Sequence, residues 1–157
     1  MSVKILALIV SVTFAAIGWG ASLDHPELSG TWNLNPSLSE IHTHVPTQLT
    51  WEIEQKDGTI HLVERSQEMK NPTEIRCATD GHDCQVKEEG RPATVSFYYN
   101  GPVLVELETE GQNKDTITKR RMHVSSDGNT LTVDVNHILP ADKPQEKLVL
   151  TKQPSTH

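Results

Sequence analysis

The chain has 157 residues, a formal net charge of −7 and only two cysteines. Its longest basic cluster is Lys119-Arg120-Arg121. An acidic chain with so little clustered positive charge lacks the surface that nucleic acids or anionic lipids require, so both are excluded as partners. The length suits one domain with a core of useful size.

The first 22 residues have the pattern of a secretory signal peptide. Lys4 precedes an apolar run from Ile5 to Ile17, and small residues follow up to Ser22. The run of about 13 residues is shorter than the roughly 20 that cross a bilayer. We therefore expect cleavage near residues 20–22, secretion to the periplasm or the extracellular space, and no membrane insertion after cleavage. The mature domain would cover residues 23–153, followed by a frayed tail over 154–157.

Alternation of apolar and polar residues predicts a series of short strands. In Gln48–Gln55, for example, Leu49, Trp51 and Ile53 share one face. The breaks hold glycine beside Asn, Asp or Glu, which suits tight hairpins. The expected strands are 30–34, 48–55, 59–66, 74–77, 84–87, 94–99, 103–109, 116–124, 130–136 and 148–150. The sequence thus predicts an all-β domain, an antiparallel meander of about 8–10 strands that forms a barrel or half-barrel.

One short helix is expected directly after the first strand. Asn35 can cap a helical turn, and Pro36 suits the first helical position. Such a helix could close one end of a barrel.

The segment 103–109 alternates between valines or leucine and glutamates. Val103, Val105 and Leu107 share one face, which is expected to be dry. Glu106 and Glu108 share the other face and are expected to point to water.

Cys77 and Cys84 flank an Asp80-Gly81 turn. In an exported protein this arrangement predicts a disulfide that staples a hairpin made of Glu74–Cys77 and Cys84–Lys87. Closing a loop of about 8 residues stabilises the fold by roughly 2.5 kcal/mol in the chain-entropy model. The spacing does not fit a redox Cys-x-x-Cys, and a structural zinc site would require two more ligands.

The order of elements resembles the lipocalin and fatty-acid-binding-protein superfamily, the calycins. Gly30-Thr31-Trp32 in the first strand is similar to the Gly-x-Trp signature of that superfamily. Residues 29–36, with Ser39 behind them, resemble the start of small secreted bacterial lipocalin-like proteins of unknown function. In lipocalins a basic residue near the end of the last strand packs over this tryptophan. The resemblance therefore implies a structural role for Gly30, Trp32 and Lys152.

Four side chains are candidate ligand-binding residues. Trp51, Phe97 and Tyr99 lie on apolar faces that must line either a cavity or a filled core. Arg120 shares a face with Met122 and could meet an acidic group of a ligand, or pair with an acidic neighbour at the barrel rim. Fatty-acid-binding proteins hold a carboxylate with an Arg-x-Tyr pair on the last strand, and the run 148–153 lacks that pair.

Two functions remain open at this stage. The first is a barrel that binds a small, mostly apolar ligand. The alternative is an envelope or extracellular interaction or inhibitor module with a filled core, whose protein partner is unknown.

Motifs for catalysis, for a cofactor and for a metal are not found. The sequence holds no Gly-x-Ser-x-Gly, no His-Glu-x-x-His and no phosphate-cradling glycine loop. His42 and His44 could reach a metal with His61 or His82, but no third ligand is identified, and no metal site is predicted. The chain is not expected to be an enzyme or to hold a cofactor.

Overall fold

The computed structural model describes residues 25–44, 48–88, 91–111 and 114–154, and the structural statements below refer to these ranges. The predicted signal peptide, its cleavage site and the end of the predicted tail lie outside them. Within the described part of the chain, no helix is long and apolar enough to cross a membrane.

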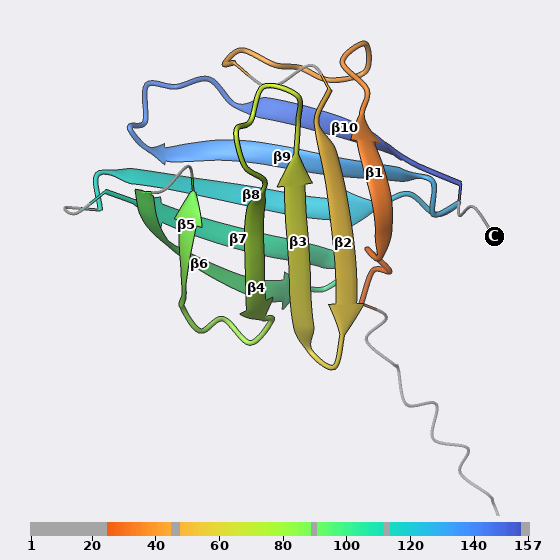
Figure 1. The fold of residues 1–157 in the computed structure, drawn as a ribbon, viewed down its shortest axis with the longest axis horizontal. Coiled ribbons are helices and arrows are strands. Elements are labelled where there is room, and N and C mark those ends of the chain that lie inside the picture. Colours follow the sequence, from red (N-terminus) through yellow and green to blue (C-terminus); the bar gives the residue numbers. More distant parts are fainter. Residues whose placement is uncertain (1–24, 45–47, 89–90, 112–113, 155–157) are drawn as a thin grey trace, which may run out of the picture.

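The described residues form one antiparallel sheet of ten strands. Each strand pairs with the next one in the chain, except that β4 does not pair with β5, while β1 also pairs with β10. In Figure 1, β2, β3 and β4 run along one direction in front and β6, β7 and β8 cross behind them, so the sheet curls into a nearly closed barrel. The strands are β1 (Gly30–Leu34), β2 (Thr50–Lys56), β3 (Thr59–Arg65), β4 (Thr73–Ala78), β5 (Cys84–Glu88), β6 (Arg91–Asn100), β7 (Val103–Glu110), β8 (Thr116–Val124), β9 (Thr130–Leu139) and β10 (Glu146–Lys152).

The apolar face of the sheet is turned inward. Trp32, Trp51 and Phe97 are the largest fully buried side chains, and they belong to one core cluster that draws on β1, β2 and β6. Hairpins form where the sequence places Gly58, Gly101 and other glycines with positive φ, which tight antiparallel turns require. The prediction of an all-β meander of eight to ten strands is confirmed.

The expected short helix after β1 is wrong for the described chain. Residues 36–38 form only a turn, in which the Leu38 amide donates to the Asn35 carbonyl at 3.2 Å. The chain then rejoins the sheet, because the amides of Asn35 and Glu40 donate to the carbonyls of Val149 and Lys147 at 2.8 Å. With its two ends held by β10, this segment is too short for a helix.

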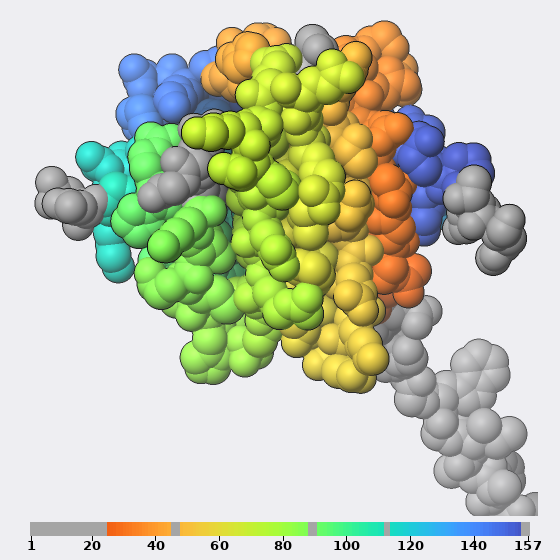
Figure 2. Space-filling view, viewed as in Figure 1, coloured from red at the N-terminus to blue at the C-terminus, as the bar shows by residue number. Residues whose placement is uncertain are grey.

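The disulfide between Cys77 and Cys84 is present, but the strands that it joins are not a hairpin. β4 pairs only with β3, and β5 only with β6. Between them the Gly81 amide donates to the Phe97 carbonyl at 2.8 Å. The disulfide therefore links the two edges of the sheet, which meet on the face shown in Figure 2.

The predicted orientation of β7 is wrong. Leu104 lies in the core cluster, and strand alternation puts Glu106 and Glu108 on the same inner side. The two glutamates are 0% and 2% exposed instead of facing water. The strand begins with three consecutive apolar residues, so its pattern fits either orientation, and a shift by one residue exchanges the two faces.

Candidate functional site

A cavity of about 290 Å³ lies at one end of the barrel interior. It is at the end where β2, β8 and β10 begin and where β3, β7 and β9 finish. Apolar side chains share its wall with an unusual number of ionisable ones. The lining residues are Thr43, His44, Leu49, Trp51, Glu64, Glu108, Glu110, Thr116, Thr118, Arg120, Val135, His137, Lys143, Glu146 and Leu148.

Arg120 joins two buried glutamates on the neighbouring strand. Its Nη1 atom lies 2.7 Å from Glu106 Oε1 and 2.9 Å from Glu108 Oε2. The β7–β8 hairpin places Glu106 directly opposite Arg120. Buried charges are tolerated when they are paired in this way, and N–H donors of an arginine suit carboxylate oxygens.

This pair does not satisfy the carboxylates completely. Burial raises the pKa of Glu106, the Arg120 guanidinium opposes that rise, and the charge of Glu108 adds to it. Oε2 of Glu106 is buried and has no hydrogen-bond partner among the described residues. Arg120 therefore leaves one buried carboxyl oxygen of Glu106 without a hydrogen bond in the described chain.

A third glutamate faces the same cavity from the other side of the barrel. Glu64 on β3 lies opposite Trp51 on β2. Burial raises its pKa, which Arg120 lowers and Glu108 raises further. The Trp51 indole N–H also favours the charged form of Glu64, yet it makes no hydrogen bond of ordinary geometry with a described residue, although Trp51 is only 2% exposed.

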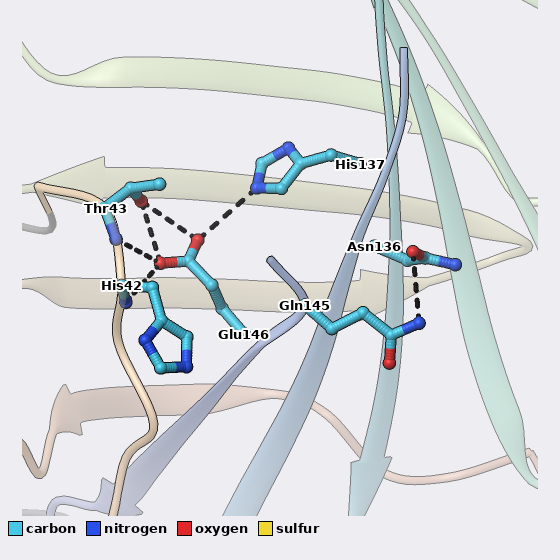
Figure 3. A network of polar contacts seen from close by, with 6 residues as sticks. All are labelled: His42, Thr43, Asn136, His137, Gln145 and Glu146. Carbon is cyan, nitrogen blue, oxygen red and sulfur yellow. Dashed lines mark hydrogen bonds and ion pairs between the residues drawn. The ribbon is translucent and has the colours of Figure 1, made fainter. Parts of the chain in front are cut away.

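Glu146 ties the loop after β1 to the cavity (Figure 3). Its Oε1 accepts hydrogen bonds from the amides of His42 and Thr43 at 2.8 and 2.6 Å, and both of its oxygens accept from the Thr43 hydroxyl at 2.9 Å. Burial alone would raise the pKa of Glu146, but the hydrogen bonds outweigh it and hold the pKa below the ordinary value. Glu146 is therefore a structural anchor.

His137 stands between this anchor and the cavity. Its Nε2 lies 3.5 Å from Glu146 Oε2, and its ring points toward that carboxylate in Figure 3. Nδ1 of the same ring is buried without a hydrogen-bond partner in the described chain. One ring nitrogen is thus left for a ligand or for water.

The opposite end of the barrel is closed by packing. Leu28 and Trp32 are fully buried, and the Trp32 indole N–H donates to the Leu28 carbonyl at 2.8 Å. The Leu28 amide donates to Gln55 Oε1 at 3.0 Å, and Gln55 Nε2 donates to the Tyr99 hydroxyl at 2.9 Å. His25 stacks on the Tyr99 ring, with 3.7 Å between the ring centroids.

The predicted ligand-binding residues therefore fall into two groups. Trp51 and Arg120 line the cavity. Phe97 is fully buried in the core, and Tyr99 belongs to the closed end. Of the four predicted ligand-binding residues, only Trp51 and Arg120 therefore lie beside the ionisable side chains of the cavity.

The predicted structural residues lie together at the closed end. Trp32 and Lys152 are cross-strand neighbours, with Lys152 Nζ 5.1 Å from the centroid of the indole ring. Gly30 has φ +141°, and a Cβ there would lie 2.6 Å from Lys152 Cε. Glycine at this position thus gives the lysine room to cross the tryptophan.

Sequence reasoning missed the acidic side of the cavity: Glu64, Glu106, Glu108 and Glu146, together with His137. A signal for part of it was available. Arg120 was expected to face inward, and the hairpin register fixes Glu106 as its direct neighbour on the same face. Glu64 and Glu146 come from distant strands, and no local pattern reveals that they meet.

Comparisons with known proteins place the fold. No protein-family model matches the chain, and no curated protein matches it in sequence. Among solved structures, a secretory abundant heat soluble protein from Ramazzottius varieornatus has a TM-score of 0.66 at 8% identity, covering 83% of this chain and 98% of its own. Fatty-acid-binding protein 1 of Echinococcus granulosus has a TM-score of 0.62 at 15% identity, and the match covers 81% of this chain and 98% of that protein. Lipid-binding protein 8 of Caenorhabditis elegans has a TM-score of 0.61 at 11% identity, and the match covers 80% of this chain and 94% of that protein.

Identities this low show a shared fold and nothing of a shared ligand. The expected resemblance is confirmed at that level: the chain has the calycin fold, the β-barrel common to lipocalins and fatty-acid-binding proteins.

Proposed function

We propose that this protein is a secreted binding protein without enzymatic activity, which holds a small molecule in the cavity at the polar end of its barrel. The observation that carries the proposal is the buried indole N–H of Trp51, which lines the cavity beside Glu64 and makes no hydrogen bond of ordinary geometry with a described residue. Buried polar groups are nearly always satisfied, so a donor left open in a cavity wall suits a ligand.

The size and lining of the cavity define what would fit. About 290 Å³ lies at the lower end of the range for small-molecule pockets. Leu49, Trp51 and Leu148 offer apolar contact, and Glu64 and Arg120 offer polar contact. The fold supports this role, because several neighbours of known structure are named as fatty-acid-binding or lipid-binding proteins.

Trp51 is a built-in reporter for the test. A panel of small amphiphiles with apolar groups of the size of a phenyl ring is titrated into the purified protein while its tryptophan fluorescence is followed. We expect a saturable change that is lost in Trp51→Phe and kept in Trp32→Phe, since Trp32 does not line the cavity and its indole N–H is bonded to the Leu28 carbonyl. If no member of the panel gives a saturable signal in folded protein, the cavity is not a binding site.

Export is supported by the signal-like residues 1–22 and by the Cys77–Cys84 disulfide, a bond typical of oxidising compartments. The test is expression of the full chain, followed by N-terminal sequencing of the protein recovered outside the cytoplasm. We expect a mature chain that starts between Ala21 and Leu23. Recovery of the intact chain in the cytoplasm alone would refute export.

A further inference from the structure

Carboxyl groups outnumber basic side chains around the cavity. Five carboxylates line it or touch its arginine: Glu64, Glu106, Glu108, Glu110 and Glu146. The lining holds two side chains with a permanent positive charge, Arg120 and Lys143, and two histidines, His44 and His137. One of these histidines is directed elsewhere, because the exposed His44 ring lies 2.8 Å from Glu68.

Arg120 is engaged before any ligand arrives. Both Glu106 and Glu108 lie within 3 Å of its Nη1. An anionic ligand would have to compete with two buried carboxylates for this guanidinium and would meet Glu64 beside it. The site therefore disfavours the acidic ligand group that the sequence suggested for Arg120.

We infer that the cavity selects a small organic cation, an amine whose apolar part packs on Trp51 and whose ammonium group faces Glu64 and Glu108. This inference rests on the proposed function and names the ligand class for the same site. The Trp51 ring adds to it, because indole faces attract cations and its open N–H can donate to an acceptor atom elsewhere on the ligand.

An organic cation fits better than a metal ion. In the described residues, no group of three or more His, Cys, Asp or Glu side chains is placed to hold a metal. A cavity of about 290 Å³ with apolar and aromatic wall residues instead suits a molecule of several carbon atoms.

Cation binding should release protons from the cavity. Burial raises the pKa of Glu64 in the cavity wall and of Glu106 behind it, and an ammonium group facing Glu64 would lower the pKa of both carboxyl groups again. Affinity for an amine should therefore rise with pH as these carboxyls ionise in the free protein. His44, His137 and Lys143 also line the cavity, so a variant of Glu64 is needed to isolate the contribution of this carboxyl group.

The experiment compares three probes of similar shape: 2-phenylethylamine, 2-phenylethanol and 3-phenylpropanoate. Each is titrated into the purified protein by tryptophan fluorescence and by calorimetry in two buffers of different ionisation enthalpy. We expect the amine to bind at least about tenfold more tightly than the alcohol, and the anion to bind most weakly. The amine should show a buffer-dependent enthalpy with the sign of proton release, which the neutral alcohol should lack.

Glu64→Gln tests the assignment within the site, and Glu54→Gln is its matched control. Glu54 lies on β2 with a largely exposed side chain that is not part of the cavity. In Glu64→Gln the amine should lose most of its advantage over the alcohol, while Glu54→Gln should behave as the unmodified protein. Near-ultraviolet circular dichroism checks that each variant is folded.

The outcomes separate the two proposals. If the alcohol or the anion binds as tightly as the amine, the charge selection is refuted, and ligand binding in the cavity stands. If none of the probes binds to the folded, unmodified protein, both are refuted. These comparisons use the unmodified protein, so they remain decisive even if Glu64→Gln does not fold.

Discussion

At the closed end of the barrel, Leu28 and Trp32 are fully buried, and the Leu28 amide and the Trp32 indole N–H both donate hydrogen bonds there. On the side of the cavity, Trp51, which is the cross-strand neighbour of Trp32, and Glu106 are also buried but keep polar atoms without hydrogen bonds of ordinary geometry in the described chain. Satisfied burial stabilises a fold, whereas unsatisfied burial costs free energy. Violations of good packing tend to concentrate where function requires them. The contrast assigns stability to the closed end and binding to the polar end.

The largest expected effect tests the closed end. Trp32→Ala should lower the free energy of unfolding by about 3–5 kcal/mol, because it empties a fully buried site of an aromatic ring. Urea denaturation followed by far-ultraviolet circular dichroism measures it. Trp51→Phe should cost less than about 1.5 kcal/mol, since the lost N–H has no partner to leave unsatisfied. Equal losses for Trp51→Phe and Trp32→Phe would remove the contrast between the two indoles.

The next largest effect on the unfolding free energy is expected at Glu146, the anchor at the polar end. Glu146→Ala leaves the amides of His42 and Thr43 without their acceptor and should cost about 2–3 kcal/mol at neutral pH. Because the pKa of Glu146 is lowered in the fold, its contribution is present above the ordinary value of 4.5 and is lost as pH falls through the lowered value. Denaturation curves should therefore show a large difference between the variant and the unmodified protein at pH 7, and this difference should shrink as the pH falls below 4.5. An unchanged difference would contradict this role.

Glu106 should show the opposite dependence of stability on pH. The pKa of Glu106 is raised by burial, so its ionisation destabilises the fold as pH rises from the ordinary 4.5 through the raised value. Glu106→Gln should therefore increase the unfolding free energy at neutral pH by about 1 kcal/mol, while Glu108 still pairs with Arg120. The gain should vanish in acid. A loss of stability at neutral pH would mean that the ion pair outweighs the cost of burial.

The smallest effect concerns the lysine over Trp32. Lys152→Met keeps the length of the side chain but removes its charge, and should cost about 0.5–1 kcal/mol. Lys152→Arg should retain or improve stability, because a planar guanidinium stacks well on an indole. Thermal unfolding of the two variants side by side measures the difference. If methionine stabilises the protein as well as arginine does, the contact is packing alone.

Most of the fold could be read from the chain because each strand carries its own alternation and each hairpin its own turn residues. The segments 30–34 and 116–124 match β1 and β8 at both ends. The failures occurred where long-range contacts decide. Hydrogen bonds to β10 hold Asn35 and Glu40 in place of a helix, and β7 turns its glutamates inward toward Arg120.

The candidate site was harder to predict than the fold for the same reason. Its polar wall comes from β3, β7, β8, β9 and β10, and each contributes an ionisable residue that looks like an ordinary surface position in its own strand. Arg120 was recognised because it interrupts an apolar face. Glu64 and Glu146 carry no such local signal, and only closure of the barrel brings them to one cavity.

The first strand pairs with the last, and this pairing determines when the barrel can close. Lys152 covers Trp32, and Thr151 pairs with Asn33. The part of the core that is synthesised first is therefore completed only by residues that are synthesised much later. Contacts of such wide separation form slowly, because the chain loses much freedom before they repay it. A nascent chain therefore cannot close the barrel until β10 has been synthesised.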